Sequence, residues 1–240
     1  MFYTDEGIEV PSVNEDQMRE VDRIATDETG PNLYQMMENA GRSLALLAIE
    51  VLGNGWEKAK VVVLAGTGGN GGGGICAARH LANRAVKVAI CLSKPEGLRE
   101  VPSFQRKIYQ FAGGREIDQT KLENEKFDLI IDALIGYSLR SAPHGTILDL
   151  INWANVNNTP ILSLDIPSGV DSTTGETYGE FIKTHWTMTL ALPKTGLVPE
   201  KTGQLFLADI GIPNETYFRM GFNNYKSPFG ESFRVKITAG

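Results

Sequence analysis

Three short segments of the sequence combine glycine, carboxylate and hydroxyl groups in patterns that could do chemistry. Seven of the nine residues from Gly66 to Gly74 are glycine, in the order GTGGNGGGG. The other two segments begin at Asp132 (DALIGYSLR) and at Asp165 (DIPSGVD). Where side chains are missing, backbone N–H groups can approach an anion closely. The glycine segment is therefore suited to binding a phosphate.

The context of the glycine segment narrows the ligand. Gly66, Gly68 and Gly71 satisfy G-x-G-x-x-G between an expected strand and an expected helix, which favours a dinucleotide. No acidic residue ends the next strand to bind a ribose, so an ordinary NAD dehydrogenase is not indicated. A Walker A loop is excluded because no Gly-Lys-Ser/Thr ends the segment. A plain tight turn is the alternative interpretation.

The two aspartates follow apolar runs, where a lone carboxylate is costly unless it meets a cation or several donors. Asp132 could therefore belong to a site, or it could simply cap a neighbouring loop. Asn70, Asp132, Asp165 and Ser168 all offer oxygen atoms, which suit Mg²⁺, Ca²⁺ or an alkali ion better than zinc. The three histidines have no partner at metal-ligand spacing and are not expected in catalysis: His80, His144 and His185.

The elements that must position these residues can be read from the apolar spacing. Two helical segments come first, one opened by Ser12 with Glu15 in a capping-box pattern and one opened by Pro31. Expected strands then cover 60–66, 86–93, 127–136, 160–167, 185–193 and 204–211, and expected helices cover 74–85, 102–111 and 147–157. This alternation predicts an α/β fold with a mainly parallel sheet covered on both faces. Ligands of such sheets bind beyond the carboxyl ends of the strands, where all three segments lie.

Length and charge set the class of protein. We expect one domain over residues 1–240, with a core of about 12–212 and a weakly patterned, partly mobile tail from Glu215, because no segment has the composition of a linker. The formal net charge of −6 makes nucleic-acid or membrane-surface binding unexpected. The sequence shows neither a signal-peptide pattern nor a long apolar run, so we expect a cytoplasmic protein. Cys76 and Cys91 are expected to be reduced core residues.

Five ordered motifs resemble the YjeF N-terminal domain family, the NAD(P)H-hydrate epimerases. GTGGNGGGG followed by ICAARHL is similar to the family pattern GxGNNGGDG followed by LVAARHL, and DALIGYS is similar to DALFGxG. Asp165 to Gly175 matches DIPSGxDxxTG. Met37 to Gly41 resembles the MENAG element, and Thr189 to Gly196 resembles T-x-x-x-PKxG. The resemblance covers about residues 12 to 212.

This resemblance implies a Rossmann-like three-layer α/β/α sandwich with N-terminal helices, usually as a homodimer. It implies an isomerase of nicotinamide nucleotide repair, which interconverts the R and S forms of the 6-hydroxy hydrates of NADH and NADPH. By motif position, one K⁺ per subunit would be held by Asn70, Asp132 and Ser168. Asp165 would be the acid–base residue and would contact the substrate. The other substrate contacts would be Gly69, Asn70, Gly71, Gly72, Gly73, Gly136, Tyr137, Ser138, Leu139, Arg140, Ser141 and Ala142.

The implied reaction is chemically reasonable, because the hydrated carbon bears both a nitrogen and a hydroxyl group. Nitrogen could help to expel water, and water could return on the other face, with a carboxyl group moving the protons. Some family members are fused to a dehydratase domain, and such a fusion would be longer than this chain. A separate NAD(P)H-hydrate dehydratase is therefore the expected pathway partner. An alternative is a non-catalytic nucleotide-binding or dimerisation module, because Gly69 and Gly73 stand where the family carries Asn and Asp.

Overall fold

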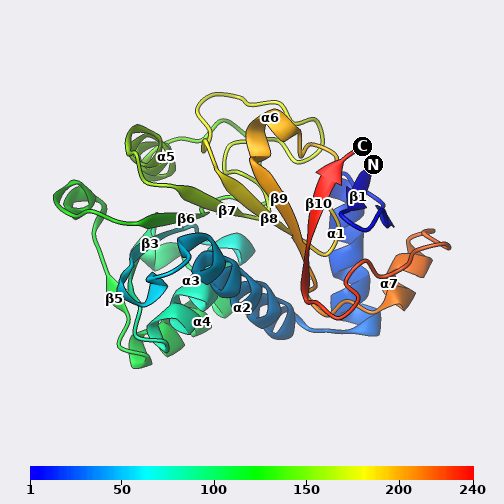
Figure 1. Ribbon diagram of the computed structural model, residues 1–240, viewed down its shortest axis with the longest axis horizontal. Coiled ribbons are helices and arrows are strands. Elements are labelled where there is room, and N and C mark those ends of the chain that lie inside the picture. Colours follow the sequence, from blue (N-terminus) through cyan, green and yellow to red (C-terminus); the bar gives the residue numbers. More distant parts are fainter.

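The computed structural model describes residues 1–240 and contains one ten-stranded sheet (Figure 1). The strand order is β2-β1-β10-β9-β8-β7-β6-β3-β4-β5. All neighbours from β9 to β5 are parallel, and the β2-β1-β10-β9 edge is antiparallel. The strands are β1 (Phe2–Thr4), β2 (Glu9–Val10), β3 (Lys60–Ala65), β4 (Lys87–Leu92), β5 (Arg115–Glu116), β6 (Leu129–Ala133), β7 (Ile161–Leu164), β8 (Trp186–Leu190), β9 (Gln204–Ala208) and β10 (Arg234–Ala239).

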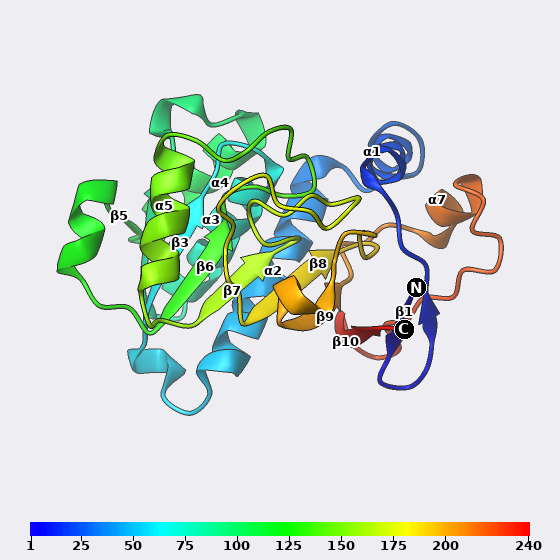
Figure 2. The same ribbon diagram turned by 90° about the horizontal axis from the view of Figure 1, so that it is seen from above.

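Helices cover both faces of the sheet, as Figures 1 and 2 show. Helices α2, α3 and α4 lie on one face and α5 lies on the other, while α1 and α7 lie beside the antiparallel edge. The predicted α/β three-layer architecture with a mainly parallel sheet is therefore confirmed. The α-helices are α1 (Glu15–Ile24), α2 (Leu33–Leu52), α3 (Gly69–Ala82), α4 (Glu100–Phe111), α5 (Thr146–Val156), α6 (Pro199–Thr202) and α7 (Asn214–Arg219), joined by a π-helix (Ala25–Thr29) and 3₁₀ turns (Trp56–Lys58, Pro95–Gly97, Gln119–Asn124).

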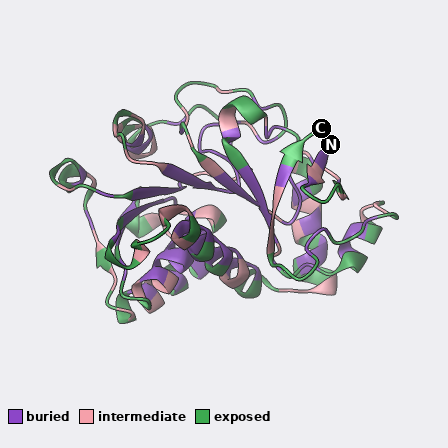
Figure 3. Cartoon of the chain, in the orientation of Figure 1, coloured by how far each residue is buried: buried purple, intermediate pink, exposed green.

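The alternation of side chains along β3 explains the layers. Val61 and Val63 face α2 and α3 in one apolar core, while Val62 and Leu64 face α5 in another. The central strands β3, β4 and β6 are buried along almost their whole length, and Figure 3 shows the middle of the sheet as buried. A third core joins α1 to the antiparallel edge and the C-terminal segment. None of the helices is both long enough and apolar enough to cross a bilayer.

Helix α3 begins at Gly69, so the prediction of a start at Gly74 is wrong. Glycine disfavours helix by about 1 kcal/mol per residue, but here it allows very close packing. A Cβ added to Gly72 would lie 2.5 Å from Met37 Sδ of α2, and one added to Gly74 would lie 2.5 Å from Ala133 Cβ of β6. The first three residues of the glycine segment (66–68) are therefore loop, and the other six (69–74) form the closely packed first turns of α3.

The ends of the chain contain structure that the sequence pattern did not indicate. Strands β1 and β2 precede α1, and β10 lies between β9 and β1 although it is formed by the last residues. The tail also contributes most of α7, and its Tyr217 and Phe229 belong to the apolar core that contains Met18 and Val21 of α1. The capping box of α1 is formed by Asn14 and Gln17, so Ser12 does not open that helix.

Candidate functional site

The three glycine- and aspartate-containing segments meet at one edge of the sheet. They follow β3, β6 and β7, which are neighbours in the sheet, and the Lys194 segment follows β8 next to them. From β3 the chain continues to β4 on one side of β3, and it later returns to form β6 on the other side of β3. This reversal makes the carboxyl ends of β3 and β6 the crevice in which doubly wound sheets bind ligands.

The first turn of α3 presents free backbone donors at this crevice. The first intrahelical hydrogen bond runs from Gly72 N to Gly68 O, so the N–H groups of Gly69, Asn70 and Gly71 have no partner within the helix. These groups and the helix dipole favour an anion. Gly71 is required for the turn itself, because a Cβ there would lie 1.9 Å from Gly66 O.

Asp132 is fully buried and joins two strand ends. Its carboxylate accepts hydrogen bonds from Ser163 Oγ (2.9 Å), Ser168 Oγ (2.6 Å), Ser168 N (2.9 Å) and Leu134 N (3.2 Å). Burial raises the pKa of Asp132, and the Ser168 hydroxyl opposes this by hydrogen bonding to the carboxylate. All four donors are neutral, so no basic side chain compensates the buried charge.

Asp165 has an unusual backbone conformation and an ionic partner. Its φ of 68° lies in the left-handed region, which is uncommon outside glycine and clusters at functional sites. Its Oδ1 accepts from Lys194 Nζ at 2.5 Å, and its Oδ2 accepts from Tyr137 N at 3.1 Å. The Lys194 and Asp165 side chains are 1% and 5% exposed, so this ion pair is almost completely buried. Lys194 lies in a motif singled out from the sequence, but its contact with Asp165 is shown only by the structure.

Tyr137 extends the network to the first helix. Its hydroxyl donates to Asp22 Oδ2 at 2.6 Å, and its ring lies 5.8 Å from both Lys194 Nζ and the Arg19 guanidinium carbon. Sequence reasoning placed Tyr137 among the substrate contacts but missed Asp22 and Arg19. Both come from an amphipathic helix with no motif, and only the tertiary packing of α1 brings them to the strand ends.

Gly136 marks the point where the segments converge. A Cβ on Gly136 would lie 3.3 Å from Asn70 Cγ and 3.3 Å from Asp165 Oδ2. Ile135, the residue before Gly136, donates a backbone hydrogen bond to the Ser168 hydroxyl at 2.9 Å. The structure therefore brings Asn70, Gly136 and Asp165 together, with Asp132 and Ser168 beside them. Gly72 and Gly73 instead pack against Met37 and Leu164, away from Gly136.

A cleft of about 570 Å³ opens beside this convergence. Residues 138–142, all predicted substrate contacts, line it. It also includes Arg19, Arg99 and His144, which sequence reasoning did not select. Arg99 precedes α4, and its N–H donates to Thr67 O at 3.2 Å, which holds it against the glycine segment. With Arg140, three guanidinium groups make the cleft suited to an anionic ligand.

A family model described as "YjeF-related protein N-terminus" matches residues 33–196. The chain belongs to this family. A protein named NAD(P)H-hydrate epimerase from Dehalogenimonas lykanthroporepellens is 51% identical over 99% of this chain and 97% of its own length. Another protein of that name, from Weissella koreensis, is 33% identical over 84% of this chain and 91% of its own length.

Other members of the YjeF N-terminal family are longer. The bifunctional NAD(P)H-hydrate repair enzyme Nnr of Moorella thermoacetica is 34% identical over 86% of this chain, which covers 42% of that protein. The crystal structure of yeast ynu0 has the same fold, with a TM-score of 0.79 over 95% of this chain and 100% of its own, at 24% identity.

Two motifs of the YjeF N-terminal family meet away from the strand ends. Glu38 of the MENAG element accepts from Arg79 Nη2 at 2.5 Å and contacts His80 Nε2 at 2.8 Å, so these residues join α2 to α3. Cys76 lies in the same cluster, and burial raises its pKa to about 12. The guanidinium of Arg79 contacts all three other side chains. The cluster thus already contains its own cation and serves packing.

Proposed function

We propose that this chain is an NAD(P)H-hydrate epimerase, an isomerase that interconverts the R and S forms of the 6-hydroxy hydrates of NADH and NADPH. The observation that carries the proposal is the convergence of Asn70, Gly136 and Asp165 beside an anion-binding helix terminus. It is supported by the likeness over 99% of the chain to a protein with that name.

We propose one orientation of the dinucleotide in the crevice. We assign its pyrophosphate to the N-terminus of α3, where the N–H groups from Gly69 to Gly71 are free. Residues 138–142 line the adjacent cleft, and its arginines complement the negative charge of the ligand. This leaves the hydrated nicotinamide near Gly136, where the missing side chain allows it to approach Asp165 Oδ2. The contacts of Gly72 and Gly73 would be made through their backbone only.

A monovalent cation fits the residues assigned to K⁺. Asn70, Asp132 and Ser168 supply only oxygen ligands, the donor type that alkali ions prefer. Asp132 carries a buried charge without a basic partner, and Asn70 Nδ2 is buried without any hydrogen-bond partner. Since the two ends of an amide are assigned by their contacts, Asn70 can turn its oxygen toward the ion. Bound there, K⁺ would compensate the charge of Asp132 and fix the loop that carries Gly136.

Inversion of the hydrated carbon requires one of its bonds to nitrogen or oxygen to open and close again. A group must move a proton at the hydroxyl, and Asp165 is the acid–base residue that lies nearest to Gly136. The burial of Asp165 strengthens its electrostatic effect on the substrate and limits access of water. The chain's contribution is thus to bind, orient and move one proton at Asp165 Oδ2.

The proposed partners follow from the same relatives. Longer relatives are named bifunctional repair enzymes, which combine two activities in one chain. We propose that a separate NAD(P)H-hydrate dehydratase consumes the product of this chain. A homodimer is also part of the proposal, as the family resemblance implies.

The test supplies the pure R or S hydrate of NADH or NADPH in potassium buffer and follows the appearance of the other isomer. We expect interconversion well above the spontaneous rate for the wild-type protein. Asp165→Asn should bind the nucleotide but lose turnover by at least about 100-fold. Nucleotide binding without acceleration by the wild-type protein would contradict the proposal and favour a binding module.

A further inference from the structure

The Asp165 carboxylate meets hydrogen-bond donors on every contact it makes. Lys194 Nζ and the Tyr137 N–H have no lone pair to offer, and the Thr189 hydroxyl donates to Oδ1 at 3.4 Å. A protonated carboxyl group would need an acceptor for its own hydrogen. Of these three contacts only the Thr189 hydroxyl has lone pairs, but it already faces the Lys194 ammonium at 3.5 Å and lies 3.4 Å from Oδ1, the oxygen that accepts from Lys194 at 2.5 Å. The contacts therefore hold Asp165 as a carboxylate in the free protein.

Lys194 is equally well fixed as an ammonium group. Its three hydrogens meet Asp165 Oδ1 at 2.5 Å, Leu190 O at 3.0 Å and Thr189 Oγ1 at 3.5 Å. Its own segment is held by Val13, which pairs with it through hydrogen bonds from Val13 N to Pro193 O (3.0 Å) and from Thr195 N to Val13 O (2.9 Å). A buried ion pair of this kind persists because its polar atoms are satisfied.

We infer that Lys194 is a positioning residue that keeps Asp165 ionised, so that Asp165 first removes the hydroxyl proton of the hydrate and the ring opens at its C–N bond. This inference rests on the proposed function and deepens it. Departure of the hydroxyl as water would require the opposite order, in which Asp165 starts as an acid. The buried pair holds Asp165 in the form that can only accept a proton.

The atoms and electrons of this route balance without any added reactant. The hydroxyl proton moves to Asp165 Oδ2, the C–O bond becomes an aldehyde, and the electron pair of the C–N bond goes to the ring nitrogen. That nitrogen is conjugated with the carboxamide, which spreads the charge. Rotation about the neighbouring C–C bond presents the other face of the aldehyde. The nitrogen then adds back, and Asp165 returns the proton to the oxygen.

Oxygen isotopes distinguish the two routes in the wild-type protein. The S hydrate of NADH is converted in water enriched in ¹⁸O, and the R hydrate formed in the first turnovers is analysed by mass spectrometry. Ring opening keeps the original oxygen in most turnovers, whereas loss of water introduces one ¹⁸O with each inversion. Uptake of ¹⁸O in step with inversion would overturn the inference. The uncatalysed reaction in the same water supplies the background.

Substitution of Lys194 tests its part separately. Lys194→Met should lower turnover about 100-fold while KM changes by less than about threefold, because only the acid–base group is affected. Methylammonium should raise the turnover of Lys194→Ala at least about tenfold, because it can replace the missing ammonium group. Tetramethylammonium has no N–H group and should not raise it. Lys201→Met is the matched control, because Lys201 contacts the Gly175 carbonyl and the Phe181 ring and makes no ion pair with a carboxylate.

The outcomes separate this inference from the proposed function. Near-normal turnover of Lys194→Met, or no rescue of a folded Lys194→Ala, would overturn the role of Lys194. If the variants do not fold, the isotope experiment on the wild-type protein still decides the route. Failure of the wild-type protein to interconvert the hydrates at all would instead remove the proposed function.

Discussion

The Tyr137 hydroxyl donates a 2.6 Å hydrogen bond to the carboxylate of Asp22, which lies 115 residues earlier in the chain. This bond joins the loop after β6 to α1 beside the buried pair of Asp165 and Lys194. Burial raises the pKa of Asp22, and it also raises the pKa of Tyr137. The folded protein therefore holds a proton on Asp22 more tightly than the unfolded chain does.

The raised pKa of Asp22 should make the difference in stability between Asp22→Asn and the wild type depend on pH. A raised folded-state pKa contributes stability below the pKa of the unfolded chain, and this contribution is lost as pH rises through the folded value. Relative to the wild type, Asp22→Asn should therefore become more stable as pH increases from about 3 to 7. Urea denaturation at several pH values measures the difference. The exposed Asp16→Asn on the same helix is the control, and an equal trend in both would contradict the prediction.

The arginines of the cleft should contribute to nucleotide binding. Arg99→Gln and Arg140→Gln should each weaken binding of the hydrate by about three- to tenfold, and the loss should shrink at high salt because these side chains are exposed. Titration calorimetry at two salt concentrations measures both effects. Lys107→Gln removes an exposed charge from α4 outside the cleft and should leave binding unchanged.

Two glycines of α3 should respond oppositely to the same substitution. Gly69 faces open space, so Gly69→Ala should stabilise the fold by about 0.5 kcal/mol through helix propensity. Gly71→Ala would place its Cβ against Gly66 O and should cost about 3 kcal/mol or more. Thermal unfolding of the two variants provides the comparison. Equal stability of both would show that the turn adapts more easily than its geometry indicates.

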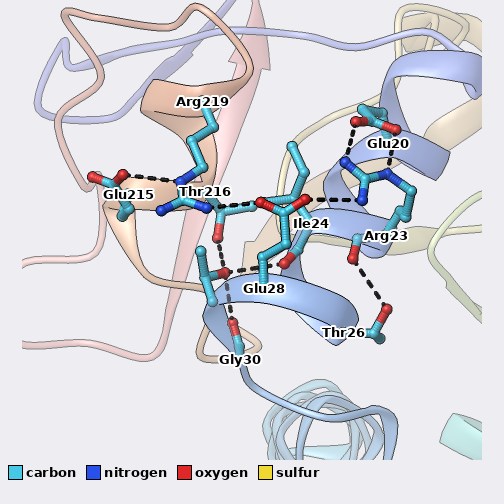
Figure 4. Close-up of polar contacts among 10 residues, drawn as sticks. Glu20, Arg23, Ile24, Thr26, Glu28, Gly30, Glu215, Thr216 and Arg219 are labelled. Carbon is cyan, nitrogen blue, oxygen red and sulfur yellow. Dashed lines mark hydrogen bonds and ion pairs between the residues drawn. The ribbon is translucent and has the colours of Figure 1, made fainter.

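The contact between the π-helix and α7 should depend on its buried hydroxyls rather than on its ion pairs. Figure 4 shows Arg219 linked to Glu28 and Glu215, and Thr216 beside the same segment. Arg219 is 44% exposed, so Arg219→Gln should cost less than about 1 kcal/mol. Thr216 is fully buried and its hydroxyl lies 2.6 Å from that of Thr29, so Thr216→Val should cost about 1–2 kcal/mol. Denaturant unfolding should rank the two in this order.

Epimerase activity should depend on the cation assigned to Asn70. Activity should rise with K⁺ concentration to a plateau, and Asn70→Ala should raise the half-saturating concentration by about tenfold, since a direct ligand is lost. Asn83→Ala changes an asparagine at the other end of α3 and serves as the control. A cation response that is identical in all three proteins would contradict the assignment.

The central parallel strands β3, β4, β6 and β7 could be predicted because they are buried on both faces. Runs such as Val61 to Ala65 therefore read as continuous apolar segments ended by the residues of the site. The start of α3 could not be predicted, because glycine propensity opposes a helix that is imposed by the approach of Gly72 to Met37 and of Gly74 to Ala133. Tertiary packing outweighs local preference at these positions.

Some residues of the candidate site could likewise be predicted from the sequence, and others could not. Asn70, Asp132, Asp165 and Ser168 could be selected because polar residues at the ends of apolar strands need partners. The residues that surround Asp165 come from further along the chain or from its first helix, as with Lys194 and Asp22. Their roles depend on side-chain distances that no spacing in the sequence encodes. The ion pair of Lys194 with Asp165, on which the inferred order of proton transfer depends, is visible only in the structure.

Strand β10 lies between β9 and β1, and the last residue donates a hydrogen bond from Gly240 N to Met1 O at 3.0 Å. During synthesis on the ribosome, the parallel sheet can therefore form well before its antiparallel edge. The first strand has no neighbour in the main sheet until β10 has left the exit tunnel. Closure of this edge pairs residues as far apart as Phe2 and Ala239, and it follows the formation of the parallel part.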